Sequence, residues 1–518
     1  MNKDNKDKQE KSEKQDNQKN NKRKHNKKST GITVKKADNF SEWYTQVCLQ
    51  QGANLVDLRY GVQGFVVHMP YAMKIIRRIY DLLDEELEKD GHEPFLFPTV
   101  IPKANLMKEQ EHAGFVPDVY WVTTAGTEKL DKPLALRPTG ETALYPMYSL
   151  WIRSYKDLPF KRYQTRITVY RNEKTTRPFL RGREFMFFES HDVFRTHKNA
   201  LKQIKTDMKI MDKVVWKTLK LPFIFFKRPK WDKFLGAEDT FASDTLMPDG
   251  KRNQMSSTHD LAHNFAKPFN VKFKDNDGED KYGWQTCFGP GIYRIMASLI
   301  GILGDDQGLI LPTAVAPIHV VIIPIMFKGK EDLGKDILNY CQDIKKSLGK
   351  KLNVFIDDSI DESPGFKYNK YEMLGVPVRL EIGGREMNEN KITLARRTSK
   401  EKVKVSLHDL KNEIKKQLKL VDNEIEAKSS EYFKDNTKEA ETFDEVKKII
   451  EEYRGFIKVP FCSIGFDGEK CADVLKAETF GGYVSGIKYK KPEKVKKGQK
   501  CVVCGKKAKH IVYVCKSY

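Results

Sequence analysis

Apolar side chains recur at helical spacing in residues 71–89, where one side of a helix would carry Met73, Ile75, Ile76, Ile79, Leu82, Leu83 and Leu87. Gly91 follows this run, and glycine commonly ends helices. The pattern predicts an amphipathic helix from Tyr71 to Lys89. A shorter helix is predicted from Ser41 to Gln50, with Ser41 as its N-cap.

Residues 130–195 and 240–312 alternate β-rich runs with turns. Together they predict one antiparallel sheet flanked by helices. Phe95 to Pro102 is also strand-like, but it contains prolines, which belong at sheet edges or in extended segments.

From Val315 onward the pattern changes to alternating strands and helices. The predicted elements are a strand at His319–Pro324, a helix at Asp332–Leu348, a strand at Leu352–Ile356, a helix at Lys367–Leu374 and a strand at Val376–Ile382. This alternation is typical of a small α/β domain with a largely parallel sheet. A charged helix from about His408 to Lys434 then leads to a compact unit holding five of the eight cysteines.

Composition narrows the possible partners. The chain has 518 residues, which is too long for one hydrophobic core. Its formal net charge of +22 indicates a polyanionic partner rather than a charge that only keeps the protein in solution. Residues 1–36 are rich in Lys and Asn, and we expect them to be disordered. The sequence has neither an apolar run of about 20 residues nor a signal-peptide core, so we expect a cytoplasmic protein without membrane contact.

The most informative motif is the pair of segments Tyr170–Glu173 and Arg181–Glu189. Arginines, carboxylates and aromatic rings alternate along it, and alternate residues of a strand share a face. A guanidinium, an aromatic plane and a carboxylate on one surface suit a nucleotide. The alternative is an antiparallel hairpin that carries only surface ion pairs.

Two further motifs flank this hairpin. In Leu136–Thr142, a hydroxyl at Thr139 and a carboxylate at Glu141 flank Gly140, a pair able to hold a cationic amine. In Gly289–Arg294, a glycine-rich turn leads into an apolar helix, where an arginine at the helix entrance can meet phosphate.

Taken in order, these motifs resemble the three signature motifs of class II aminoacyl-tRNA synthetases, with Phe95–Pro102 as the dimer segment. The chain is most similar to the prolyl-tRNA synthetase family of the archaeal and eukaryotic type. The resemblance spans about residues 39–518 and rests also on Trp121–Thr123, Pro178–Arg181, Arg183–Phe185, Gly304–Leu309, Pro364–Asn369, Gly375–Glu381 and Lys516–Tyr518.

The resemblance implies an α/β multidomain fold. Residues 37–312 would form the class II catalytic domain, an antiparallel sheet flanked by helices. Residues 313–420 would form an α/β anticodon-binding domain, and residues 421–518 a small α+β zinc-binding domain.

The implied activity is ATP-dependent attachment of L-proline to tRNA(Pro) through a prolyl-adenylate, by a homodimer. Arg171 and Arg294 would be catalytic, and Thr139, Glu141, Arg171 and His259 would bind proline. ATP would be bound by Arg171, Glu173, Arg181, Phe185, Gln254, Ser257 and Arg294, with Gln254 near Mg²⁺. Anticodon contacts would come from Arg379, Glu381 and Arg385, and Tyr518 would point toward the active site.

Three positions depart from the family pattern. Gly140 stands where serine is usual, Phe187-Phe188 where an aromatic–Gln pair is common, and Gly383–Glu386 where Gly-Pro-Arg-Asp is expected. None of them removes a charged group that the chemistry requires. Between Arg195 and Gln254 only about sixty residues separate the motifs, too few for the editing insertion of bacterial-type enzymes, so no editing in cis is expected.

The late cysteines indicate a metal site. Cys501 and Cys504 form a Cys-x-x-Cys knuckle, and Cys462 with Cys471 supplies a second pair. Four thiolates predict a structural zinc site, with a redox pair as the alternative and Cys515 as a competing ligand.

Two other functions stay open at this point. A class II synthetase for another small amino acid such as threonine would need a catalytic zinc set, but His191 and His197 have no cysteine within the hairpin. A non-catalytic tRNA-binding paralogue would be expected to have lost Arg171, Arg294 or Glu141, and all three are present.

Overall fold

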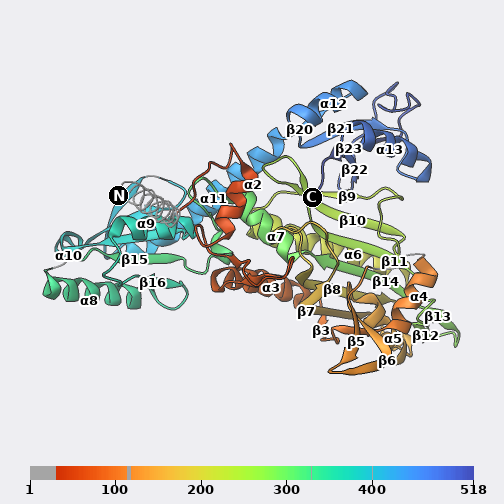
Figure 1. Ribbon diagram of the computed structural model, residues 1–518, viewed down its shortest axis with the longest axis horizontal. Coiled ribbons are helices and arrows are strands. Elements are labelled where there is room, and N and C mark those ends of the chain that lie inside the picture. The colour runs from red at the N-terminus through yellow and green to blue at the C-terminus, as the bar shows by residue number, and fades with distance from the viewer. Residues whose placement is uncertain (1–30, 114–117, 328, 400) are drawn as a thin grey trace, which may run out of the picture.

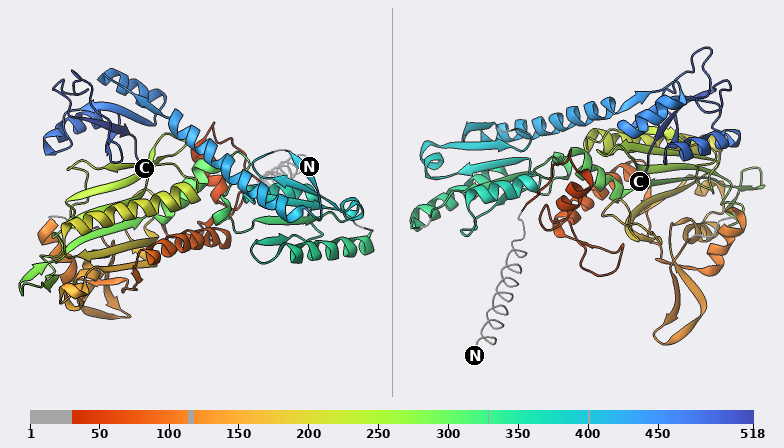
Figure 2. Two further views of the ribbon diagram at one scale, coloured as in Figure 1. Left: turned by 180° about the vertical axis from the view of Figure 1, so that it is seen from behind. Right: turned by 45° about the horizontal axis from the view of Figure 1, so that its top comes forward.

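The computed structural model describes residues 31–113, 118–327, 329–399 and 401–518. It is elongated, with a small α/β unit at one end and a large sheet at the other, where a C-terminal unit (residues 437–518) lies beside that sheet (Figure 1). Helix α11 (Leu410–Asp435) runs from the α/β unit to the C-terminal unit (Figure 2). No helix in the described part of the chain is long and apolar enough to cross a membrane.

The predicted disordered tail, residues 1–36, lies mostly outside the described residues. Its last residues contact the folded protein. The Thr33 amide donates to Gln46 Oε1 at 2.8 Å, and Lys36 Nζ donates to the carbonyl oxygens of Ile302 (3.1 Å) and Gly304 (2.6 Å). Thr33 and Lys36 therefore belong to the folded protein, contrary to the prediction of disorder up to residue 36.

The largest sheet of the described chain has eleven strands, in the order β20-β21-β23-β22-β9-β10-β11-β14-β8-β7-β3. Neighbouring strands are antiparallel except β3–β7 and β20–β21. The bounds are β3 Glu93–Pro94, β7 Phe160–Tyr170, β8 Glu184–Phe194, β9 Ile224–Lys227, β10 Asp239–Leu246, β11 Arg252–Ala262, β14 Trp284–Pro290, β20 Thr437–Glu439, β21 Phe456–Phe461, β22 Tyr483–Lys488 and β23 His510–Cys515. The antiparallel catalytic sheet predicted from the sequence is confirmed.

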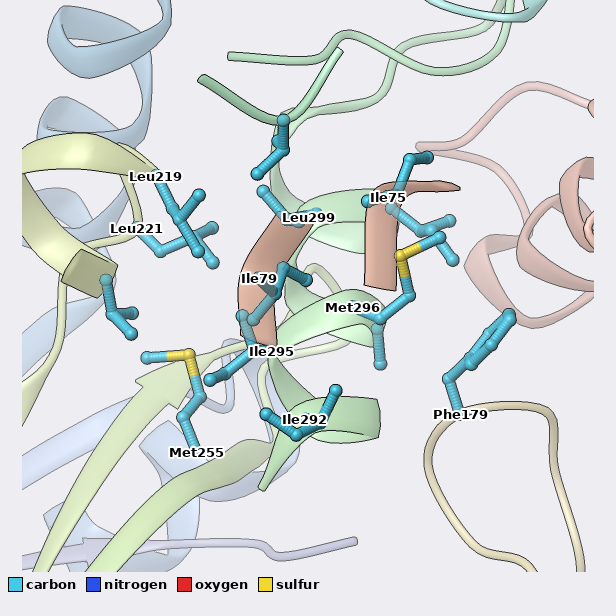
Figure 3. Packing of buried hydrophobic residues seen from close by; sticks show 14 of the residues in the cluster. Ile75, Ile79, Phe179, Leu219, Leu221, Met255, Ile292, Ile295, Met296 and Leu299 are labelled. Atoms are coloured by element: carbon cyan, nitrogen blue, oxygen red, sulfur yellow. The ribbon is translucent and has the colours of Figure 1, made fainter. Parts of the chain in front are cut away.

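Helices α3 (Pro70–Lys89), α6 (His197–Met211) and α7 (Ile292–Ser298) pack together against this sheet. Helix α6 continues as the π-helix η2 (Asp212–Thr218), and α7 as η3 (Leu299–Leu303). Ile75 and Ile79 of α3 meet Ile295 and Met296 of α7 in a fully buried apolar cluster (Figure 3). The predicted helix at 71–89 is thus present, with its apolar face in the core.

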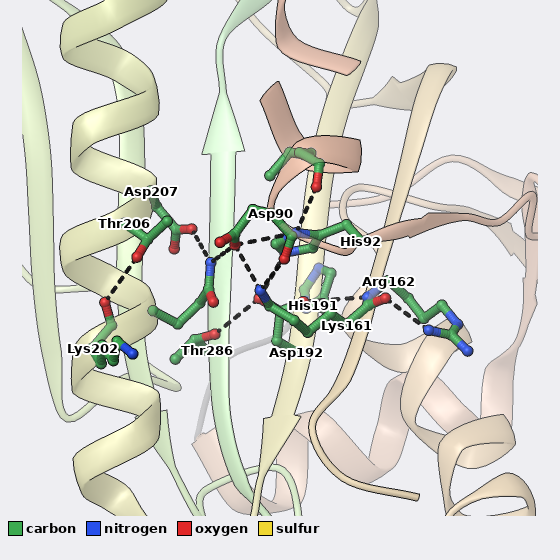
Figure 4. Close-up of polar contacts among 12 residues, drawn as sticks. Asp90, His92, Lys161, Arg162, His191, Asp192, Lys202, Thr206, Asp207 and Thr286 are labelled. Carbon is green, nitrogen blue, oxygen red and sulfur yellow. Dashed lines mark hydrogen bonds and ion pairs between the residues drawn. The ribbon is translucent and has the colours of Figure 1, made fainter. Parts of the chain in front are cut away.

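A buried polar network holds α6 to the sheet (Figure 4). Gln203 Nε2 of α6 donates to Asp207 Oδ1 and to Asp90 Oδ2, while His92 Nε2 lies 3.1 Å from Asp192 Oδ2 of β8. Burial, and then the charge of Asp192, raises the pKa of Asp207 to about 8. Asp207 is therefore mainly neutral at pH 7, which limits the charge enclosed there.

One local prediction, the helix expected from Ser41 to Gln50, differs in detail. Helix α2 covers Phe40–Cys48, and its N-cap is Asn39, whose Oδ1 accepts from the Glu42 amide, in place of Ser41. Asparagine caps as well as serine does, and this register buries Phe40. The proline-rich segment 95–99 is extended and leads into a three-stranded sheet of order β4-β6-β5.

The remaining elements of the catalytic part are short. They are β1 Val56–Asp57, β2 Val67–His68, β4 Val100–Pro102, α4 Lys103–Ala113, β5 Trp121–Ala125, β6 Glu128–Leu136, α5 Glu141–Trp151, η1 Tyr155–Asp157, β12 Lys272–Lys274, β13 Asp280–Tyr282 and η4 Thr313–Val315. Between Arg195 and Gln254 the chain forms only α6, η2, β9, β10 and the start of β11, which all belong to this part.

The α/β unit has a five-stranded sheet of order β16-β15-β17-β18-β19. Its elements are β15 Val320–Pro324, α8 Glu331–Leu348, β16 Val354–Ile356, α9 Pro364–Met373, β17 Val378–Ile382, α10 Gly384–Glu389, β18 Lys391–Arg396 and β19 Lys402–Ser406. The first three strands are parallel, as predicted, but β18 and β19 add an antiparallel pair. The sequence pattern did not indicate this pair, in part because β19 is a polar edge strand.

The C-terminal unit also contains α12 Phe443–Glu452, η5 Phe466–Gly468 and α13 Glu469–Glu478. Its sheet is continuous with the catalytic sheet, because Ile487 and Lys488 of β22 pair with Lys227 and Phe226 of β9. Gly486 stands at this joint with φ +121°, and a Cβ there would overlap the Lys227 carbonyl oxygen. Only glycine therefore permits the two strands to pair closely.

We predict that Gly486→Ala destabilises the protein more than Gly481→Ala. Gly481 also has a positive φ, +101°, but a Cβ there has nothing within 4 Å, so alanine costs only backbone strain of about 1 kcal/mol. At Gly486 the overlap adds about 1–3 kcal/mol. Calorimetry of the two purified variants measures the difference in Tm. Equal Tm values would contradict this account of the joint.

Candidate active site

A cavity of about 340 Å³ lies where the sheet meets α7. The loop between β7 and β8 supplies Arg171, Glu173 and Arg181 to its wall, and β8 supplies Phe185 and Phe187. Strand β11 supplies Gln254 and Ser257, and the first turn of α7 supplies Arg294. Seven of these eight were predicted as ATP-binding residues, and Phe187 is one of the departures from the family pattern; the fold brings all eight around one cavity.

Three guanidinium groups face this cavity with little neutralising charge. Burial, and next the positive charges of Arg181 and Arg171, lowers the pKa of Arg294 to about 10. Burial also lowers the pKa of Arg171, although the carboxylates of Glu173 and Glu141 oppose the shift. Glu173 itself is 3.1 Å from Arg181. An anion that enters the cavity would relieve this repulsion, so the arrangement suits a phosphate-bearing ligand.

The aromatic wall follows from strand alternation. Phe185 and Phe187 point into the cavity with their ring centroids 6.1 Å apart, and the Arg171 guanidinium lies 5.9 Å from the Phe185 ring centre. Phe188 points the other way and is fully buried against Tyr80 and Tyr163. Of the two atypical phenylalanines, only Phe187 can therefore affect what the cavity binds.

Thr139 and Glu141 form the predicted polar pair at the start of α5. The Thr139 hydroxyl donates to Glu141 Oε2, and Glu141 is only 2 % exposed. Burial raises the pKa of Glu141; the positive charge of His191 opposes this, and the like charge of Glu189 adds to it. A carboxylate that is this poorly solvated gains from a cationic partner.

Gly140 has a steric explanation. Its amide donates to Glu189 Oε2 at 3.2 Å, and Gln164 Nε2 donates to Glu189 Oε1 at 2.6 Å. A Cβ on residue 140 would overlap the Glu189 carboxylate. The missing side chain at Gly140 therefore makes room for a buried carboxylate that holds the loop carrying Thr139 and Glu141.

A buried group behind this pair was not foreseen from the sequence. His191 Nδ1 is 2.9 Å from the Tyr145 hydroxyl, and its Nε2 is 3.1 Å from Glu189 Oε2 and 3.8 Å from Cys287 Sγ. Ligand atoms of Glu141, His191 and Cys287 lie within 4.8 Å of one another. A cysteine does approach His191, but from a strand 96 positions away, which no local motif could indicate.

This group fits a metal poorly. Burial raises the pKa of Cys287 to about 11, so its thiol is protonated at neutral pH. His191 Nε2 is close to Glu189, and Glu141 accepts from Thr139. Since thiolates are the ligands that zinc prefers, the group is better described as a hydrogen-bonded wall.

His259 lies near this wall and does not line the cavity. Its Nδ1 is 3.0 Å from the Thr240 hydroxyl, and its ring is 5.0 Å from Phe234. Burial, and next the charge of His191, lowers the pKa of His259 to about 3, so the ring is neutral.

Gln254, predicted to lie near Mg²⁺, has its amide oxygen occupied. Gln254 Oε1 accepts from Arg228 Nη2 at 2.8 Å, and Arg228 also binds the buried carboxylate of Asp244. Among the described residues that line the cavity, Glu173 is the one carboxylate. Any Mg²⁺ would take most of its ligands from phosphates and water.

Residues 517 and 518 also reach the cavity. Ser517 and Tyr518 line it, as the family resemblance implied for Tyr518. They are held by the Arg252 amide, which donates to the Lys516 carbonyl oxygen at 2.8 Å. Arg252, Arg228 and Asp244 were not singled out from the sequence, because none belongs to a local motif.

The four late cysteines meet in the C-terminal unit. The Sγ atoms of Cys462, Cys471, Cys501 and Cys504 all lie within 4.8 Å of one another. Cys515 is elsewhere, with its Sγ 3.4 Å from the Gly250 carbonyl oxygen. Thiolates at the corners of a zinc tetrahedron are about 3.8 Å apart, and Cys462 and Cys471 are 3.7 Å apart.

The predicted anticodon residues fall into two groups. Arg379 bonds Glu372 at 2.7 Å and Glu381 at 3.0 Å, and Glu381 also pairs with Lys402. Both Arg379 and Glu381 are therefore engaged within the α/β unit. Arg385 is exposed at the start of α10.

Three family models match the chain. Residues 120–302 match the class II tRNA synthetase core domain (G, H, P, S and T), residues 319–417 an anticodon-binding domain, and residues 443–518 the C-terminal domain of prolyl-tRNA synthetase. The three matches follow the three parts of the fold.

Relatives agree along nearly the whole length. The proline–tRNA ligase of Thermofilum pendens is 51% identical over 94% of this chain and 99% of its own length. That of Thermococcus kodakarensis is 41% identical over 93% of this chain and 99% of its own. The solved Giardia lamblia prolyl-tRNA synthetase in complex with prolyl-adenylate superposes with a TM-score of 0.89 at 34% identity, covering 94% of this chain and 100% of that one. The chain belongs to the prolyl-tRNA synthetase family of the archaeal and eukaryotic type.

Proposed function

We propose that the protein ligates L-proline to tRNA(Pro) in two steps that consume ATP. The proline carboxylate attacks the α-phosphorus of ATP and releases pyrophosphate; the terminal ribose of the tRNA then attacks the prolyl-adenylate and releases AMP. The observation that carries this proposal is the arrangement of Arg171, Arg181 and Arg294 around one cavity, beside the buried Glu141. Both steps depend on positioning and charge neutralisation, which these groups provide.

The arginines divide the phosphates among them. The Glu141 carboxylate is among the charges that act on the pKa of Arg171, so we assign Arg171 to the α-phosphate and the proline carboxylate. Arg294 and Arg181 would hold the outer phosphates. Phe185 would stack on adenine, Glu173 would accept from the adenine amino group, and Gln254 and Ser257 complete the wall. Mg²⁺ would enter with ATP and screen the outer phosphates.

Proline would be held through its secondary ammonium group. Glu141 supplies the carboxylate and Thr139 the hydroxyl, and the desolvated ammonium needs both. His259 lies outside the lining of the cavity; being neutral, it would add no positive charge against the ammonium.

Pyrophosphate exchange tests the activity directly. Purified protein with ATP should exchange labelled pyrophosphate when proline is added, and it should then charge tRNA(Pro). Exchange with threonine alone would favour a synthetase for another small amino acid. Exchange with no amino acid would favour a non-catalytic tRNA-binding paralogue.

We predict that Gly140→Ala raises the KM for proline on the order of tenfold or more, with a smaller effect on the KM for ATP. The new methyl group must displace Glu189, and the Thr139–Glu141 pair moves with it. Displacements of about 1 Å at reacting groups are costly. Exchange kinetics measure both constants. Gly365→Ala is the control, because a Cβ there has nothing within 4 Å; equal KM values for the two variants would refute the steric account.

The four-cysteine cluster would hold a structural zinc ion. Cys462, Cys471, Cys501 and Cys504 fit a closed tetrahedral site, which leaves no position for a substrate. The metal would fix the loops that join β21, α13 and β23.

We predict one zinc per chain by elemental analysis. Cys501→Ser should lose most of it, because three thiolates bind zinc far more weakly than four. Cys515→Ala should keep its zinc, since Cys515 lies outside the cluster. A zinc-free wild-type protein, or full zinc in Cys501→Ser, would contradict the assignment.

The protein would act as a homodimer in the cytoplasm. The segment Phe95–Pro102 lines an apolar groove of about 660 Å³ together with Met147 and Trp151, and Leu96 is 81% exposed. Such an exposed apolar surface is typical of an interface. Sedimentation should give about twice the chain mass of 60.0 kDa, and a monomer at micromolar concentration would argue against this interface.

tRNA(Pro) would reach both ends of the molecule. The α/β unit would bind the anticodon, with Arg385 as its exposed contact and the Arg379–Glu381 pair shaping the surface.

A further inference from the structure

A large share of the net positive charge of the chain lies in one short segment of the C-terminal unit. Between Lys488 and Lys509 there are ten lysines and one glutamate, a net charge of +9 within 22 residues, out of +22 for all 518. None of the proposed substrate, metal or anticodon contacts uses these lysines.

The backbone presents these lysines on a defined scaffold. A turn closed by the Gln499 amide and the Lys496 carbonyl oxygen carries Lys496 and Lys497. The cysteine knuckle follows, closed by the Cys501 amide and the Lys506 carbonyl oxygen. Residues 500 and 507 then pair as an antiparallel bridge, which sets two lysines directly opposite each other.

Most of these charges are not neutralised within the protein. Lys488 pairs with Glu493 at 4.0 Å, Lys490 with Asp212, Lys496 with Glu441 at 3.7 Å and Lys509 with Asp467 at 3.9 Å. Six exposed lysines have no carboxylate within 4 Å among the described residues: Lys491, Lys494, Lys497, Lys500, Lys506 and Lys507. We call these six the lysine surface. Like charges directly opposite each other destabilise a fold. A bound polyanion would reduce the repulsion among these lysines, which the protein itself does not neutralise.

The surface also lacks what other partners would need. In residues 490–509, which the structure describes in full, no large apolar side chain is exposed. A membrane or an apolar protein face would therefore find no apolar side chain to bury in this segment. A phosphodiester backbone needs only spaced cations. The segment begins where β22 pairs with β9, so it is joined to the same continuous sheet that carries the cavity.

We propose that the lysine surface binds the phosphodiester backbone of tRNA during charging. This inference rests on the proposed function, since it makes tRNA the polyanion. The contacts are to phosphates, so they strengthen the binding of any tRNA and leave the choice of tRNA to other parts of the protein.

The test is a four-fold variant of the full-length protein, in which Lys497, Lys500, Lys506 and Lys507 are replaced by Gln. The Kd for a tRNA(Pro) transcript should rise on the order of 10- to 100-fold at about 0.1 M salt, and the slope of log K against log salt should fall by about 3–4. A tRNA with a different anticodon should lose affinity to a similar extent. Pyrophosphate exchange with proline, which needs no tRNA, should stay unchanged.

The matched control removes the same charge from other exposed positions of the C-terminal unit: Lys438, Lys448, Lys470 and Lys476. It should bind tRNA nearly as well as the wild type. Zinc content verifies that the four-fold variant keeps its knuckle. Unchanged tRNA affinity and salt slope in the four-fold variant, or an equal loss in the control, would overturn the proposal. A wild-type protein that binds no tRNA would instead defeat the proposed function itself.

Discussion

The carboxylate of Asp244 is the group on which the cavity and its surroundings most depend. It is fully buried and binds Arg228 through both oxygens at 2.7 and 2.8 Å, and Arg252 at 3.2 Å. Arg228 in turn donates to the Ser485 carbonyl oxygen of β22 and to Gln254 of β11. One buried anion thus connects β10, β11 and the C-terminal unit. Without it, two desolvated guanidinium groups would keep only the partly exposed Asp232 as a partner, at 4.0 and 3.8 Å.

This pairing separates two kinds of arginine in a small volume. Arg228 and Arg252 are neutralised by the protein and are structural. Arg171 and Arg294 lack such a partner and face the cavity, where burial lowers the pKa of each and the positive charges of Arg181 and Arg171 lower that of Arg294 further. The fold therefore holds incompletely neutralised positive charge in the cavity, and a bound triphosphate would neutralise it. Binding and neutralisation then become the same event.

The sequence was most informative where function lies in contiguous motifs. Arg171, Arg294 and the Thr139–Glu141 pair were predicted from short strings, and helix α3 from its apolar spacing. Residues that meet only through strand register were missed. Cys287 of β14 lies opposite His191 of β8. The reason for a glycine at position 140 becomes visible only in the fold, where the start of α5 packs against the Glu189 carboxylate. The β22–β9 pairing also escaped prediction, because nothing local to either strand specifies its partner.

The shared sheet has a practical consequence for anyone seeking a minimal catalytic fragment. Residues 437–518 look detachable along the chain, yet their strand β22 covers the edge of β9. Cutting there would leave Phe225 and Phe226 on a strand with an unpaired row of amide and carbonyl groups. Bare edges of this kind recruit other chains. The truncated protein would therefore be expected to aggregate, and the C-terminal unit can be understood as protection against self-association as well as the carrier of the four-cysteine cluster.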